Sequence, residues 1–107
     1  HDALTSEELM RSRYTAFTLA DTGYLMLRQH SSTRRPGEAQ SLKKWAQSVQ
    51  WMGLVILNTY RGLPTDDTGY VEFRAFYTEA GSMQQIHEKS LFRRENGKWV
   101  YVSGVHF

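Results

Sequence analysis

The sequence has 107 residues, with 13 lysines and arginines, 11 aspartates and glutamates, and no cysteine. This length fits one domain, expected over residues 1–107, and 40% apolar residues are enough to build a core. The missing cysteine excludes a disulfide, a thiolate nucleophile and a cysteine-ligated zinc site in this chain. The net charge of +2 comes from scattered basic pairs interleaved with acids, which argues against a nucleic-acid partner.

The cellular location is read from two absences in the sequence. No apolar run approaches the roughly 20 residues of a membrane span, so we expect no membrane contact. A chain without cysteine is compatible with the cytoplasm, and a cytoplasmic location is our expectation. The chain starts at His1 instead of methionine, which indicates a fragment of a longer protein or a tag remnant.

The first half of the chain, about residues 5–50, predicts three helices. Thr5 and Glu8 have the spacing of a capping box at a helix start. The apolar residues that follow keep a helical period, and the helix should end at about Asp21.

Two shorter helices follow. Asp21 can cap a second helix that runs to about His30, where a cation is favoured by the helix dipole. Pro36-Gly37 then interrupts the chain, and residues 38–49 predict a third helix. Trp45 in this helix is expected in the core or in the wall of a pocket.

The second half, about residues 51–106, predicts an antiparallel sheet. The segment 53–60 is apolar, short and β-branched, which favours a strand buried on both faces. Residues 70–77 alternate and are rich in aromatics, and residues 87–104 form two strands around Asn96-Gly97. Helices followed by antiparallel strands predict an α+β domain with the helices on one sheet face.

The Asn96-Gly97 turn predicts the register of the last two strands. A two-residue loop pairs Glu95 with Lys98, Arg94 with Trp99, Phe92 with Tyr101, Ser90 with Ser103, and Glu88 with Val105. The face that Phe92 and Tyr101 share is aromatic and should meet the helices. Arg94 and Trp99 should form a cross-strand stack.

A second two-residue turn at Ala80-Gly81 places the preceding strand. Phe73 then opposes Glu88, and Val71 opposes Ser90, so Phe73 joins the aromatic face. A loop one residue longer would turn this strand over.

Glu88 falls on the aromatic face, where an unpaired carboxylate would be costly. Arg13 interrupts the apolar stripe of the first helix. We therefore expect Glu88 to pair with Arg13, or with the hydroxyl of Tyr14, Ser90 or Tyr101. The alternative is an ordinary buried polar network, or a strand end that reaches water.

These residues predict an apolar pocket with a polar floor. The candidate ligand-binding residues are Arg13, Tyr14, Phe73, Glu88, Ser90, Phe92, Tyr101 and Ser103. We expect no cofactor and no metal. His87 and His106 should oppose each other on the outer sheet face, but no third ligand lies near them in the sequence.

Four stretches are specific when taken in order: "LMRSRYTAF", "YLMLRQHSST", "VEFRAFYTEAG" and "HEKSLFRRENGKWVYVSG". From about Leu4 to Gly104 they resemble the middle domain of the bacterial YchJ family. The resemblance implies a cone-shaped fold of the nuclear-transport-factor-2-like superfamily, with three helices on the concave side of a bent antiparallel sheet. It also implies flanking SEC-C zinc motifs of the form CPCGS, which are missing from this chain.

The resemblance carries over residue by residue, with two departures. A family pattern E-x-S-x-F falls on Glu88, Ser90 and Phe92. In a W-H-P-S-T-like turn around His30, Gln29 replaces the tryptophan and Ser31 the proline, and the aspartate of a final Y-x-D-G pattern is Ser103. The second departure weakens any catalytic scheme that needs an acid at position 103.

Three functions remain open from the sequence. The first is a module that binds a small-molecule ligand or scaffolds a protein partner beside SEC-C zinc motifs. The second is a small-pocket enzyme that uses Glu88 in proton transfer. The third is a protein-interaction or homodimer module that uses the outer sheet face. One fold can host all three, so fold alone does not decide between them. A deep pocket that holds an acid of raised pKa would favour the enzyme, and a filled cone would favour the scaffold.

Overall fold

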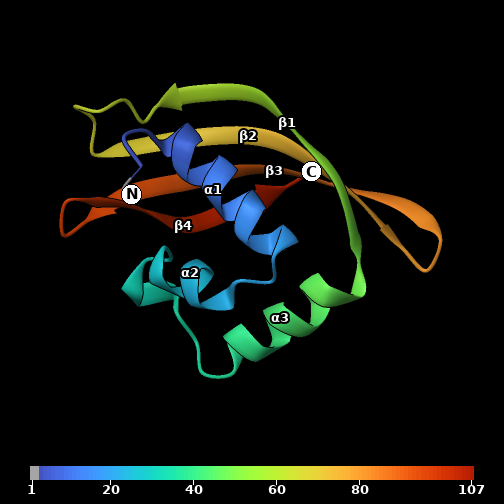
Figure 1. Ribbon diagram of the computed structural model, residues 1–107. Coiled ribbons are helices and arrows are strands. Elements are labelled where there is room, and N and C mark those ends of the chain that lie inside the picture. The colour runs from blue at the N-terminus through green and yellow to red at the C-terminus, as the bar shows by residue number, and fades with distance from the viewer. Residues whose placement is uncertain (1–2) are drawn as a thin grey trace.

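The computed structural model describes residues 3–107, where three α-helices precede four strands. The helices are α1 (Ser6–Thr18), α2 (Thr22–Leu27) and α3 (Glu38–Ser48), with a 3-10 turn at Ser31–Thr33. The strands are β1 (Gln50–Arg61), β2 (Thr68–Glu79), β3 (Ser82–Glu95) and β4 (Lys98–His106). They form one antiparallel sheet in the order β1-β2-β3-β4, with the helices over one face (Figure 1). The α+β prediction is confirmed.

The predicted helix starts are confirmed by their caps. The Thr5 hydroxyl accepts a hydrogen bond from the Glu8 amide at 3.1 Å, and the Asp21 carboxylate accepts one from the Tyr24 amide at 3.1 Å. Both bonds satisfy amides that lack an intrahelical acceptor. The first helix ends earlier than predicted, because Ala20 takes a left-handed conformation with φ of 52°.

The strand β1 corrects one prediction. It lies at the sheet edge and curves from the end of α3 along one side of the sheet (Figure 1). Its apolar run was predicted to be buried on both faces, and this is wrong: Val55 is 47% exposed. Helices cover only one sheet face, so the outward side chains of β1 meet water. Register shifts at Trp51/Gly53 and Ile56/Asn58 accompany its curvature.

The two predicted two-residue turns of the sheet are confirmed, and Ala80 and Gly81 in the first have positive φ values of 51° and 82°. Asn96 and Gly97 have positive φ values of 55° and 80°, as a type I′ turn requires. The confirmed pairs next to these turns are Glu95 with Lys98, Arg94 with Trp99, Phe92 with Tyr101, Phe73 with Glu88, and Val71 with Ser90.

A bulge overturns the register further from the Asn96-Gly97 turn. Phe92 pairs with Tyr101 but Leu91 pairs with Ser103, so Val102 is an extra residue in β4. Beyond it the pairs are Ser90 with Gly104 and Glu88 with His106, in place of the predicted Ser103 and Val105. Since side chains alternate along a strand, the extra residue turns Ser103 outward and brings His106 opposite Glu88. The predicted pairing of His87 with His106 on the outer face is therefore also wrong.

The core lies between α1 and the inner sheet face. Its buried members are Leu9, Met10, Val71, Phe73, Ala75, Phe92 and Trp99. Within residues 3–107, no helix has the length and apolar character needed to cross a membrane.

Candidate functional site

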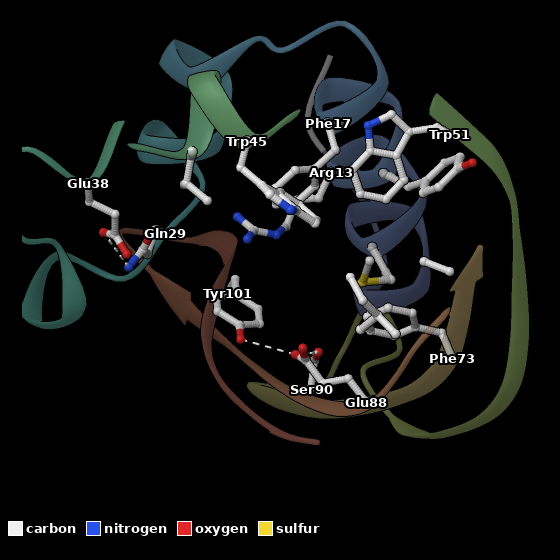
Figure 2. Close-up of a pocket in the computed structure, with 15 residues that line it drawn as sticks. Arg13, Phe17, Gln29, Glu38, Trp45, Trp51, Phe73, Glu88, Ser90 and Tyr101 are labelled. Carbon is white, nitrogen blue, oxygen red and sulfur yellow. Dashed lines mark hydrogen bonds between the residues drawn. The ribbon is translucent and has the colours of Figure 1, made fainter. Parts of the chain in front are cut away.

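A cavity of about 230 Å³ lies between the helices and the inner sheet face. Its lining side chains come from α1, α3, the α2–α3 connection and the strands (Figure 2). The core therefore fills only part of the cone, and the rest is open to a ligand of one or two rings.

Aromatic rings form one wall of the cavity. Trp45 and Trp51 meet edge to face with ring centroids 5.3 Å apart, and Tyr14 meets Trp51 at 5.7 Å in the same way. Phe17 packs on both tryptophans, at 6.3 and 5.8 Å. Interlocked rings of this kind hold one another in place, so this wall is a rigid apolar surface.

Glu88 forms the polar floor of the cavity and is only 7% exposed. Its Oε2 accepts hydrogen bonds from the Ser90 hydroxyl at 2.5 Å and from the Tyr101 hydroxyl at 3.1 Å (Figure 2). Its Oε1 lies 3.2 Å from Nε2 of His106, a side chain that is 68% exposed. The partners of Glu88 are thus two of the predicted hydroxyls and an unpredicted histidine.

Gly104 gives the Glu88 carboxylate its space. A Cβ atom at position 104 would overlap the carboxylate, whereas glycine lets the side chain lie across β4. The bulge at Val102 is what places Gly104, and not Ser103, opposite Ser90. The floor therefore depends on a register that the turn alone does not set.

Arg13 extends from α1 into the cavity and is 6% exposed. Its Nη1 donates a hydrogen bond to the Leu25 carbonyl at 3.3 Å, and its guanidinium carbon lies 4.4 Å from the Tyr101 ring centroid. The structure gives no ion pair between Arg13 and Glu88 among the residues it describes. Of the alternatives predicted for Glu88, the Ser90 and Tyr101 hydroxyls are confirmed. The direct pair with Arg13 does not form, because the Tyr101 side chain stacks on the guanidinium and binds the carboxylate instead.

Burial shifts the pKa values of both partners of this stack. Desolvation lowers the pKa of Arg13 to about 10, partly offset by electrostatic interactions with Tyr101 and Glu88 that raise it, so the guanidinium stays charged at neutral pH. Desolvation also raises the pKa of Tyr101 well above its usual range, and the nearby charge of Glu88 raises it further. Tyr101 is therefore a neutral hydroxyl donor to Glu88.

Gln29 and Glu38 close the side of the cavity opposite Phe73 (Figure 2). The Gln29 amide donates to the Thr33 carbonyl at 2.9 Å and to Glu38 Oε1 at 3.4 Å. Backbone bonds tie this segment to β4: the amide of His30 donates to the Tyr101 carbonyl, and the Tyr101 amide donates to the Arg28 carbonyl. Gln29, which stands where the resembling family has a tryptophan, thus lies in the pocket wall.

Six of the eight predicted site residues line the cavity: Arg13, Tyr14, Phe73, Glu88, Ser90 and Tyr101. Two do not. Phe92 is fully buried in the core beneath Tyr101, and Ser103 is exposed on the outer face. Residues that the site prediction missed include Phe17, Gln29, Glu38 and His106. Phe17 follows Arg13 by one helical turn, which is a signal in the sequence; the other three were brought in by turns and by the bulge.

His87, expected on the outer face, is found there in a separate pair. Its Nε2 lies 2.7 Å from Glu72 Oε2, and Asn58 donates to the other oxygen of Glu72 at 3.3 Å. In the described part of the chain, no group of three or more histidine, aspartate and glutamate side chains could hold a metal ion.

Comparison with known proteins gives consistent results. The family described as YchJ, middle NTF2-like domain, matches residues 5–104. The chain is 44% identical over 102 residues to UPF0225 protein GSU1048 of Geobacter sulfurreducens, covering 95% of this chain and 63% of that protein. It is 43% identical over 103 residues to a UPF0225 protein of Chromobacterium violaceum, covering 96% and 75%.

A solved structure resembles the whole chain. The solution structure of RPA3114, a SEC-C motif containing protein from Rhodopseudomonas palustris, superposes with a TM-score of 0.88 and 29% sequence identity. The match covers 100% of this chain and 82% of that one. The chain also spans less than two thirds of the Geobacter relative, so these proteins extend beyond the matched region.

Proposed function

We propose that this chain, which belongs to the YchJ family and matches its middle NTF2-like domain, binds a small and mainly apolar molecule in the cavity of the cone. One observation carries the proposal: an open volume of about 230 Å³ combines a rigid aromatic wall with a few oriented polar groups. Small-molecule sites have this composition, whereas a scaffold would fill its core to close packing.

The polar floor supports binding more than covalent chemistry. Glu88 accepts bonds from Ser90 and Tyr101 on one oxygen and meets His106 at the other. These contacts hold the carboxylate in one orientation. A fixed acceptor of this kind can align a polar group of a ligand. The R. palustris protein contains a SEC-C motif, which supports the proposal that this pocket works beside such motifs in a longer protein.

A second candidate is proton transfer by Glu88, and His106 favours it. The imidazole is largely in water while Glu88 lines the cavity, so the pair connects the pocket to solvent. Proton exchange through such a pair would reset Glu88 after each turnover. His106→Ala separates the candidates. It would abolish turnover of a substrate, whereas equilibrium binding would largely remain, because the Ser90 and Tyr101 hydroxyls still orient Glu88.

A screen with neutral and anionic single-ring compounds by ligand-observed NMR tests the binding proposal. Ser90→Leu and Ala75→Leu each add volume inside the cavity and should remove the binding signals. Ser103→Leu is the matched control, because it makes the same chemical change on the exposed outer face of the same hairpin. Circular dichroism confirms that each variant folds.

Two results would contradict the proposal. Binding that is equal in the wild type and in both filled variants would place the ligand elsewhere. A wild-type protein that binds none of the compounds would point to a scaffold whose cavity has no ligand.

A further inference from the structure

Arg13 is a buried cation with few partners. Among residues 3–107 its guanidinium makes one hydrogen bond, to the Leu25 carbonyl at 3.3 Å. Its other close neighbours are ring faces, those of Tyr101 at 4.4 Å and Phe17 at 5.9 Å from the guanidinium carbon. A guanidinium has five N–H donors, and burying most of them without a charged acceptor is costly.

The carboxylates that share the cavity do not supply that acceptor. Glu88 already accepts from Ser90 and Tyr101 and meets His106, and Glu38 accepts from Gln29. Figure 2 shows the guanidinium in the space between Trp45 and Tyr101, separated from both glutamates. The cation therefore faces the open volume and not a built-in partner.

We propose that the cavity selects a small aromatic monocarboxylate, whose carboxylate pairs with Arg13 while its ring packs on the wall of Phe17, Trp45 and Trp51. This inference rests on the proposed binding function and adds the class of ligand. Arginine suits the role because its planar fork donates two parallel hydrogen bonds to a carboxylate.

The charge and size of the cavity narrow the ligand further. Within the residues that the structure describes, the cavity holds one cation and two carboxylates, so Arg13 can pair with one negative charge. The second charge of a dianion such as a phosphate monoester would add repulsion from Glu38 and Glu88 with no cation to offset it. The volume of about 230 Å³ suits one or two rings. Desolvation also lowers the pKa of Arg13 to about 10, and a bound carboxylate would relieve that penalty by stabilising the charged form.

Three probes of nearly equal shape test the charge preference: benzoate, benzamide and benzylamine, titrated at neutral pH by calorimetry or chemical-shift change. We expect wild-type protein to bind benzoate about tenfold or more tightly than benzamide, and benzylamine least. Arg13→Met should remove the preference for benzoate while benzamide still binds, and Arg13→Lys should keep part of it.

Arg94→Met provides the matched control. Arg94 also stacks on an aromatic ring, with its guanidinium carbon 4.4 Å from the Trp99 centroid, but it lies outside the cavity. This variant should keep the benzoate preference within about twofold.

The outcomes separate this inference from the function on which it rests. Equal binding of benzoate and benzamide, or a benzoate preference that survives Arg13→Met, overturns the carboxylate inference and leaves the pocket proposal standing. A preference for benzylamine also overturns it and assigns selectivity to the glutamates. Failure of all three probes to bind, with no hit in the wider screen, removes both proposals.

Discussion

Two arginines stack on aromatic residues of β4 in the β3–β4 hairpin, and they differ in how their charge is met. At the turn end, Arg94 stacks on Trp99 and donates to the carbonyls of Pro64 at 2.7 Å, Asp66 at 2.8 Å and Gly97 at 3.3 Å. At the pocket, Arg13 stacks on Tyr101 at the same 4.4 Å, is more deeply buried, and has one acceptor.

The contrast separates structural from functional use of one interaction. Three carbonyl acceptors and a ring stack stabilise the guanidinium of Arg94, so its contribution to the fold explains its presence. The contacts of Arg13 do not balance its desolvation, so stability alone does not explain the residue.

Replacing Glu88 should cause the largest loss of unfolding free energy. Glu88→Ala strands the hydroxyls of Ser90 and Tyr101 and leaves Arg13 without its nearby negative charge, so we expect a loss of about 3 kcal/mol in unfolding free energy. Urea denaturation measures the loss. Glu88→Gln keeps an acceptor oxygen and should cost less. If Glu88→Ala lowers the unfolding free energy by only a few tenths of a kcal/mol, the Glu88 carboxylate reaches water and is not part of a buried network.

Arg13 is more deeply buried than Arg94, but replacing Arg13 should cost less unfolding free energy than replacing Arg94. Arg94→Met removes three hydrogen bonds and should cost about 2 kcal/mol. Arg13→Met removes one bond and a stack but also a desolvated charge, so its cost should stay below about 1 kcal/mol. The same denaturation series compares them. A larger loss for Arg13→Met would make it a structural residue and break the contrast.

Substitutions of two hairpin glycines should reduce stability for different reasons. Gly104→Ala pushes a Cβ into the Glu88 carboxylate and should cost about 2 kcal/mol, with loss of ligand binding. Gly97 has open space but a positive φ of 80°, so Gly97→Asn, which tolerates that conformation, should cost less than about 1 kcal/mol. Thermal unfolding and a benzoate titration report both effects. Tolerance of Gly104→Ala would mean that Glu88 lies elsewhere.

The smallest effect concerns pH at the turn end. The Ser31 hydroxyl donates to Glu95 and holds the pKa of that carboxyl below its ordinary value of 4.5, with the nearby His30 charge adding to the effect. The folded state thus favours the ionised form, which stabilises the fold above pH 4.5 and ceases to do so as the pH falls below it. Ser31→Ala should reduce the stability difference between neutral pH and pH of about 3. If stability falls between neutral and acid pH by the same amount in Ser31→Ala as in the wild type, Ser31 does not lower the pKa of Glu95.

The sequence by itself determined the local features of this protein. Thr5 and Asp21 begin helices because their side chains cap amides within three residues. Asn96-Gly97 makes a tight turn because both residues accept positive φ, and that turn sets the nearest strand pairs. Alternation then placed Phe73, Glu88 and Tyr101 on one face, which gave most of the pocket.

The tertiary structure decided everything that depends on how distant elements fit. The bulge at Val102 lets Gly104 clear Glu88 and brings His106 to it, and no pattern within β4 signals that extra residue. Tyr101 lies between Arg13 and Glu88, so of the partners that the sequence offered for Glu88 the hydroxyls are used and the arginine is not. Burial of β1 depends on which sheet face the helices cover. Such outcomes follow from long-range packing and desolvation, which local spacing does not encode.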